Sequence, residues 1–312
     1  MTGLLLLRSP VSAQENSETS FRLGAALSHS FGDTRYELRA KVEDPGGSGE
    51  LVDVKSQLEF PLDAVLLGLV AQWTPGHGPS RRWTLEARVD FSVTDPSGKM
   101  TDEDWIDSKQ ISYTESTPEL DMILVMAELR YHTRQQERIP VDLLFHFDYQ
   151  KIEQHIVGYE GWRGSIFSDQ QFPVSGDAPV LDYTVEYLSP QLGADAALRS
   201  SEFSSFSLQA TAGVVYASDT DDHLLRGRIS EGSGWGFGSN ARLEFALEPG
   251  FMALRWLSLS VLGELSYFHA EGDTDQRWYR DEDLPAGTEI NDIPYTIESR
   301  QARIGIALGA SF

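Results

Sequence analysis

Hydrophobic and polar side chains alternate most clearly along residues 206–223. Apolar residues occupy the even positions as far as Tyr216, and small or polar residues occupy the odd positions from Ser207 to Gly213. A period of two predicts a β-strand with one apolar face and one polar face. If the pleat continues, the odd positions place Asp219, Asp221 and His223 together on the polar side.

The same alternation recurs along the chain and predicts ten strands joined by connections of two lengths. The strands are expected at about 21–38, 51–73 with an irregularity at Pro61, 83–94, 120–131, 141–149, 180–198, 206–223, 241–247, 257–265 and 302–312. The long connections are expected at 43–49, 95–116, 158–179, a Gly- and Ser-rich stretch after residue 223, and 271–291.

Short and long connections that alternate are typical of a transmembrane β-barrel with short periplasmic turns and long external loops. A soluble β-sandwich is the alternative, since its exposed strand faces would also be polar. The predicted strands favour the membrane barrel, because several reach roughly 16 to 20 residues where about 10 cross a bilayer.

Aromatic side chains and the C-terminus support the same fold. Aromatic residues lie near the short turns, where the interface girdles of a barrel belong: Trp73, Trp83, Tyr131 and Trp256. The chain ends on Phe312 behind alternating apolar residues, which resembles the C-terminal signal of outer-membrane barrels. We therefore predict an all-β fold, a ten-stranded antiparallel transmembrane β-barrel in the outer membrane of a Gram-negative-type bacterium.

Composition narrows the function classes. The 312 residues are compatible with one barrel domain, and the absence of cysteine excludes disulfides and thiolate metal sites. A net charge of −23 argues against nucleic acid and favours cationic partners. Residues 1–13 read as the remnant of an export signal that ends in Val-Ser-Ala, so residues 14–312 are expected to form the single barrel domain.

Two acidic motifs carry the candidate chemistry, Thr-Asp-Glu-Asp-Trp-Ile-Asp at 101–107 and Asp-Thr-Asp-Asp-His at 219–223. The strand count places both at the long-loop end, in loops on opposite sides of the ring and facing one cleft. Like charges there would raise some carboxyl pKa values, and an imidazole beside Asp221 could act as a base. Each motif alone also fits a solvated acidic loop or a cation site.

Together the two motifs resemble the omptin family of outer-membrane proteases, whose signatures are Asp-x-Asp-Trp-x-Asp and Asp-x-Asp-[Asp/Glu]-His. The resemblance implies that Asp102 and Asp104 are a carboxylate pair and that Asp221 and His223 are a catalytic dyad. A water molecule held between them would lose a proton to His223, which Asp221 would orient. This mechanism needs no metal and no cofactor.

The resemblance also implies cleavage of peptides near basic residues. Asp219 matches one acid of the family's specificity pocket, and the second acid, on the first strand, is left between Asp33 and Glu37. Cationic peptides or proteins are the expected substrates, and outer-membrane lipid, including lipopolysaccharide, is the expected lipid partner. A non-catalytic barrel that serves adhesion, structure or cation binding is the alternative. Ten strands enclose too narrow a lumen for a general porin.

Overall fold

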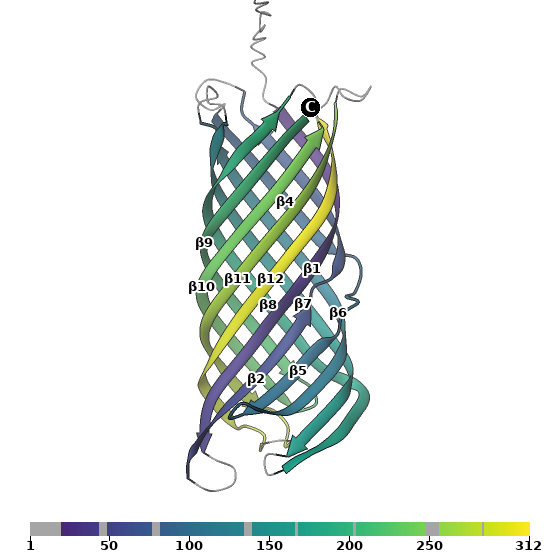
Figure 1. The fold of residues 1–312 in the computed structure, drawn as a ribbon, viewed down its shortest axis with the longest axis vertical. Coiled ribbons are helices and arrows are strands. Elements are labelled where there is room, and N and C mark those ends of the chain that lie inside the picture. Colours follow the sequence, from purple (N-terminus) through teal and green to yellow (C-terminus); the bar gives the residue numbers. More distant parts are fainter. Residues whose placement is uncertain are drawn as a thin grey trace, which may run out of the picture.

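The computed structural model describes residues 20–43, 49–76, 82–133, 139–165, 168–201, 204–247, 256–282 and 284–312. The predicted signal remnant at 1–13 lies outside the described residues. Twelve β-strands follow one another (Figure 1): β1 (Ser20–Glu43), β2 (Leu51–Pro61), β3 (Ala64–Thr74), β4 (Trp83–Ser92), β5 (Met100–Ile106), β6 (Lys109–Tyr131), β7 (Val141–Ser165), β8 (Ser168–Ser200), β9 (Ser204–His223), β10 (Arg228–Leu247), β11 (Leu257–Trp278) and β12 (Glu289–Ser311).

The strands form one closed antiparallel ring, because β12 pairs with β1. β1 pairs with β3 along its first part and with β2 along its second, so β2 and β3 are two parts of one strand interrupted after Pro61. In the same way β4 and β5 are parts of one strand beside β6. The ring therefore has ten strands, and the predicted fold is confirmed.

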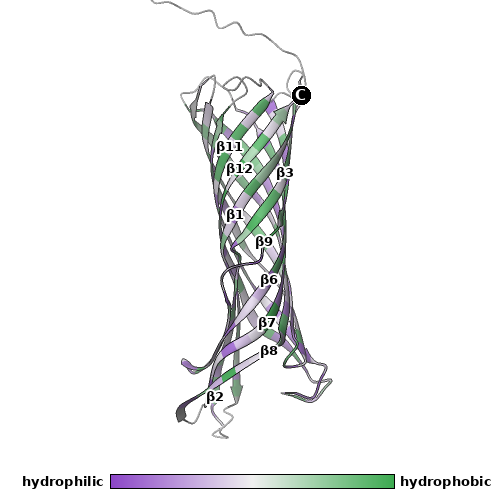
Figure 2. Ribbon diagram, turned by 90° about the vertical axis from the view of Figure 1, so that its right-hand side faces the viewer, coloured by the Kyte–Doolittle hydropathy of each residue, from purple (hydrophilic) through white to green (hydrophobic). Residues whose placement is uncertain are grey.

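The outward face is apolar at the end of the barrel that carries the C-terminus (Figure 2). Exposed side chains there include Leu69, Leu192, Leu265 and Ile304, and Trp73, Trp83 and Trp256 lie beside the short turns as predicted. Among the described residues, no helix is long and apolar enough to cross a membrane.

The apolar band ends before the acidic motifs. On β9 the last aliphatic side chain on the outward face is Val214, which is 53% exposed. The next outward residue is Tyr216, whose ring packs against Trp235 with centroids 5.0 Å apart. The next outward positions are Ser218, Thr220 and Asp222. Everything on β9 beyond Tyr216 therefore lies outside the lipid-facing band.

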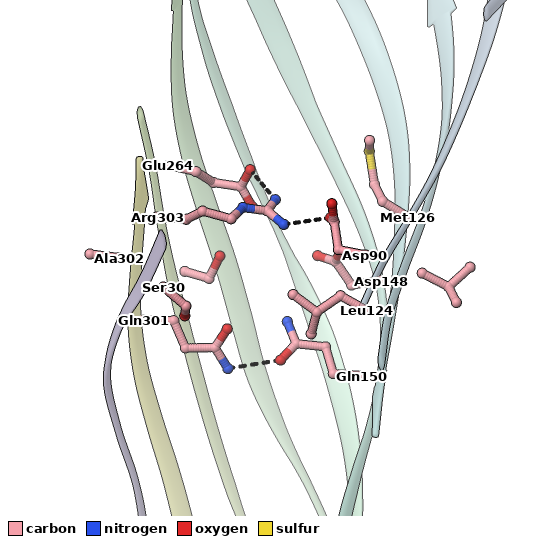
Figure 3. Close-up of a pocket in the computed structure, with 12 residues that line it drawn as sticks. Ser30, Asp90, Leu124, Met126, Asp148, Gln150, Glu264, Gln301, Ala302 and Arg303 are labelled. Atoms are coloured by element: carbon pink, nitrogen blue, oxygen red, sulfur yellow. Dashed lines mark hydrogen bonds and ion pairs between the residues drawn. The ribbon is translucent and has the colours of Figure 1, made fainter. Parts of the chain in front are cut away.

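Side chains fill the lumen between the apolar band and the acidic motifs. At the middle of the barrel, Arg303 donates to Asp90 at 2.7 Å and to Glu264 at 2.6 Å, and Gln301 donates to Gln150 at 2.8 Å (Figure 3). Beyond this layer lies a buried aromatic cluster that includes Tyr36, Phe60, Tyr183, Tyr187, Phe268 and Tyr295. The cluster forms the floor beneath the acidic motifs.

The strands extend much further from the apolar band than the hydrophobic pattern predicts. The predicted long connections at 95–116, 158–179 and 271–291 were wrong in extent: β7 and β8 pair as far as Ser165 and Ser168, and β10 already begins at Arg228. Beyond the lipid the outward face of a strand meets water, so apolar residues no longer mark that face and the hydrophobic alternation fades. The ladder of backbone hydrogen bonds continues there regardless of side-chain polarity.

Candidate active site

The first acidic motif lies mostly on a strand, where the sequence had indicated a loop. Residues 101–106 belong to β5, which pairs with β2 on one side and β6 on the other. Asp107 and Ser108 turn the chain into β6, and their φ values of 48° and 73° are those of a tight two-residue hairpin. Because the strand period is two, Asp102 and Asp104 point to the same, inward face, and their side chains are 16% and 18% exposed.

The second motif ends β9, and the pleat continues to its last residue. Asp219, Asp221 and His223 are 5%, 0% and 5% exposed, whereas Thr220 and Asp222 between them are partly exposed on the other face. The prediction that the odd positions share the inner side is confirmed.

One cavity of about 340 Å³ joins the two motifs, since Asp102 and His223 both line it. Its other walls combine the aromatic and aliphatic side chains of Tyr159, Trp162, Val174, Val180 and Leu225 with the polar or charged side chains of Ser112, Thr114, Arg163 and Arg226. The structure therefore brings Asp102 of the predicted carboxylate pair and His223 of the predicted dyad to a single space at the outer end of the barrel.

Two arginines that sequence reasoning missed lie among these acids. Arg226 places Nη2 3.5 Å from Oδ2 of Asp104 and 3.9 Å from Oδ2 of Asp102. Arg228 places Nη2 3.5 Å from Oδ2 of Asp221. Both lie within five residues after His223, and this proximity in sequence could have indicated that they belong to the site. Their positive charge makes the site less acidic than the motifs alone suggest.

Burial and charge change the protonation of the site. Burial, and then the neighbouring Asp104, raise the pKa of Asp102 to about 7. Burial also raises the pKa of Asp221, against the opposing effect of Arg228 and Arg226. Burial, Arg226 and Arg228 together hold the pKa of His223 well below its usual value, so the imidazole is neutral at neutral pH and can accept a proton.

The dyad does not make a direct hydrogen bond. Nδ1 of His223 and Oδ1 of Asp221 have no hydrogen-bond partner among the described residues. The two side chains lie two residues apart on one face of β9. Hydrogen bonds between catalytic groups often tighten only when substrate binds, so the spacing remains compatible with a dyad.

Asp219 lies deeper than the dyad. Both of its carboxylate oxygens are buried without a hydrogen-bond partner in the described part of the chain, and burial, followed by the charge of Asp221, raises its pKa well above the usual value. Burial, followed by the nearby carboxyl group of Asp219, raises the pKa values of the phenols of Tyr36, Tyr183 and Tyr295. A buried carboxyl group with unused oxygens is suited to a cationic partner.

The structure contradicts both candidates for the second pocket acid. Thr34 and Tyr36 are the buried, inward positions of β1, which places Asp33 and Glu37 on the outward face. Glu37 is paired there with Arg39 at 2.7 Å and with Lys55 at 3.1 Å. The inward side chain of this segment near Asp219 is the phenol of Tyr36, so Asp219 has no carboxylate partner from β1.

Within the described ranges, no group of three or more His, Cys, Asp or Glu side chains is placed to hold a metal ion. The inward acids face arginines instead of converging on a common point.

Fold and site together define an outer-membrane β-barrel with a cavity, lined by Asp102 and His223, beyond the lipid-facing band. A model of the Omptin family matches residues 53–276, a range that contains both acidic motifs, so the chain belongs to the Omptin family. The protein is located in the outer membrane. A search of curated protein sequences found no match.

Among solved structures, the outer membrane protease OmpT from Escherichia coli is similar with a TM-score of 0.74 and 13% identity, over 94% of this chain and 97% of that chain. The outer membrane protein OprG from Pseudomonas aeruginosa aligns with a TM-score of 0.39 and 10% identity, over 94% of this chain and 95% of that chain. The likeness to OmpT supports the ten-stranded fold.

Proposed function

We propose that this protein is an outer-membrane endopeptidase whose active site faces outward and whose nucleophile is a water molecule. The observation that carries the proposal is the convergence of Asp102 and His223 on one cavity beyond the lipid-facing band. Asp104 contacts Arg226 on the wall of this cavity, and Asp221 lies two residues from His223. A surface cavity of about 340 Å³ has room for a substrate side chain next to these groups.

The chemistry follows from the protonation of the site. Neutral His223 takes a proton from the water as its oxygen bonds to the carbonyl carbon of the scissile peptide. Asp221 stabilises the imidazolium that forms. The proton then passes to the leaving nitrogen as the C–N bond breaks, which restores neutral His223. Asp102 and Asp104 hold the water, and with a pKa of about 7 Asp102 carries a proton in part of the molecules at neutral pH.

We propose in addition that cleavage occurs near basic residues. The two oxygens of Asp219 are buried and unpaired in the described structure, so an incoming Arg or Lys side chain would restore the charged carboxylate through charge-assisted hydrogen bonds. The protein's charge of −23 would draw cationic peptides to the outer end of the barrel. Outer-membrane lipid, including lipopolysaccharide, is the environment in which we expect this activity.

The test is cleavage of a peptide library by refolded protein and by matched variants. His223→Ala and Asp221→Asn should each abolish cleavage, while Asp104→Asn should leave a much lower rate. His155→Ala is the control, because this histidine is 43% exposed on the side of β7 and pairs with Asp182. Full activity of His223→Ala would contradict the mechanism, and inhibition by a chelator would favour a metal site on the same acids.

The same library tests the preference for basic residues. Asp219→Ala should weaken the selection of Arg and Lys at the scissile bond while other cleavage persists. An unchanged cleavage profile in Asp219→Ala, or a wild-type preference for acidic or apolar residues, would contradict the role of Asp219. Neither result would bear on the role of His223.

A further inference from the structure

Arg226 is held by the turn between β9 and β10. Its backbone N–H donates to the carbonyl oxygen of His223 at 3.0 Å. The carbonyl oxygen of Gly227 accepts from the backbone N–H of Tyr279 at 2.8 Å, which ties the turn to the segment after β11. Gly227 has a φ of 57°, a left-handed conformation that completes the turn. The position of Arg226 relative to His223 is therefore set by the backbone.

The side chain of Arg226 crosses from the dyad to the carboxylate pair. The turn that carries it follows His223, whereas its guanidinium lies 3.5 Å from Asp104 and 3.9 Å from Asp102 on β5. Arg226 also lines the cavity that Asp102 and His223 share. The guanidinium thus stands beside the space that the scissile carbonyl and the attacking water must occupy.

Hydrolysis at this place requires a donor for the oxyanion. Attack by water puts a negative charge on the carbonyl oxygen, and ionised carboxylates nearby would oppose it. The hydroxyl of Ser112 already donates a hydrogen bond to Asp104 at 2.9 Å, and the guanidinium of Arg228 lies 3.5 Å from Asp221. A guanidinium has five N–H donors, so Arg226 can serve more than one acceptor at the same time.

We propose that Arg226 is a further catalytic residue, which donates hydrogen bonds to the carbonyl oxygen of the scissile peptide as that oxygen becomes an oxyanion. This inference rests on the proposed peptidase function. It adds an electrophile to the base, the orienting acid and the pair of carboxyl groups of the proposed mechanism. The same positive charge helps to hold the pKa of His223 low, which keeps the base neutral at the start of the reaction.

The experiment compares Arg226→Ala, Arg226→Lys and a control, Arg280→Ala, on one peptide that the wild type cleaves. Arg280 is an exposed arginine that packs against Gly227, so its removal touches the same turn without reaching the cavity. Folding of each variant is checked by its migration on a gel without boiling. Arg226→Ala should lower kcat by roughly 10²- to 10³-fold with little change in KM, the size typical for loss of one oxyanion donor.

The pH profile separates this role from a structural one. Without the charge of Arg226 the pKa of His223 rises, so the acid limb of kcat/KM in Arg226→Ala should move to higher pH. Arg226→Lys keeps a positive charge and should recover part of kcat and the wild-type acid limb. Arg280→Ala should match the wild type in both.

The outcomes distinguish the inference from the function on which it rests. Wild-type kcat in Arg226→Ala, with His223→Ala inactive, would overturn the role of Arg226 and leave the peptidase proposal standing. A change confined to KM, or an unmoved acid limb, would also overturn it. No cleavage by the wild type, or full activity of His223→Ala, would overturn both.

Discussion

Replacing Asp102 with Asn should make the barrel's stability less dependent on pH. Asp102 is 16% exposed beside Asp104, and burial and this neighbour raise its pKa from 3.8 to about 7. Between these two pH values the folded protein holds a proton that the unfolded chain has lost. The stability of the wild type should therefore fall as pH rises through this window, and Asn removes the effect because it does not ionise.

The structure sets the size of the effect. A shift from 3.8 to about 7 is roughly three pKa units. At about 1.4 kcal/mol per unit, this corresponds to about 4 kcal/mol of stability, present below pH 4 and lost above pH 8. The contact of Arg226 with Asp102, at 3.9 Å, already opposes the shift, and its effect is included in the raised pKa.

The measurement is urea unfolding of refolded protein in detergent at pH 4, 6 and 8, with the free energy extrapolated to zero urea. The advantage of Asp102→Asn over the wild type should grow by about 4 kcal/mol from the lowest to the highest pH. Asp107→Asn is the control, because this carboxylate is exposed at the turn of the same hairpin, and its profile should follow the wild type. An equal difference between Asp102→Asn and wild type at all three pH values would refute the reasoning.

Three further predictions concern the barrel itself. Since the ring closes all its strand pairings, unboiled refolded protein should migrate differently from boiled protein on a gel, and identical migration would contradict a closed barrel. Deleting Phe312, whose backbone N–H donates to Phe21 at 2.8 Å, should impair assembly into the outer membrane while the precursor is still made. Gly236→Ala should destabilise the barrel by about 1–3 kcal/mol, because the new methyl group would meet the carbonyl oxygen of His269 at 1.8 Å. Gly263→Ala, where the new methyl group would meet no atom within 4 Å apart from its chain neighbours, should be tolerated in the same unfolding assay, and an equal loss in both variants would contradict the steric argument.

The local pattern of the sequence was sufficient to predict the strands that face lipid. It was also sufficient to predict which residues of the second acidic motif point into the barrel. Period-two alternation on β9 predicts the shared face of Asp219, Asp221 and His223, because side-chain direction in a strand depends only on position. The same rule would have aligned Asp102 with Asp104 had that motif been assigned to a strand. The number of strands follows from the same alternation.

The outer half of the barrel could be known only from the tertiary structure. Beyond the lipid-facing band the hydrophobic alternation fades, so β5, the outer ends of β7 and β8, and the start of β10 were indistinguishable from loops. Their strand structure comes from pairing with neighbours distant in sequence, such as Asp102 with Leu58 on β2 and Thr114 on β6.

The partners of the acids also depend on the closed ring. Arg226 reaches Asp104 across 122 residues of sequence only because closure brings β5 opposite the turn after β9. Whether Asp33, Tyr36 or Glu37 faces Asp219 is decided by the pleat of β1 in its ring register, and the structure places Tyr36 there. Residue type and spacing determined which groups were available, while strand register and ring closure determined which of them meet.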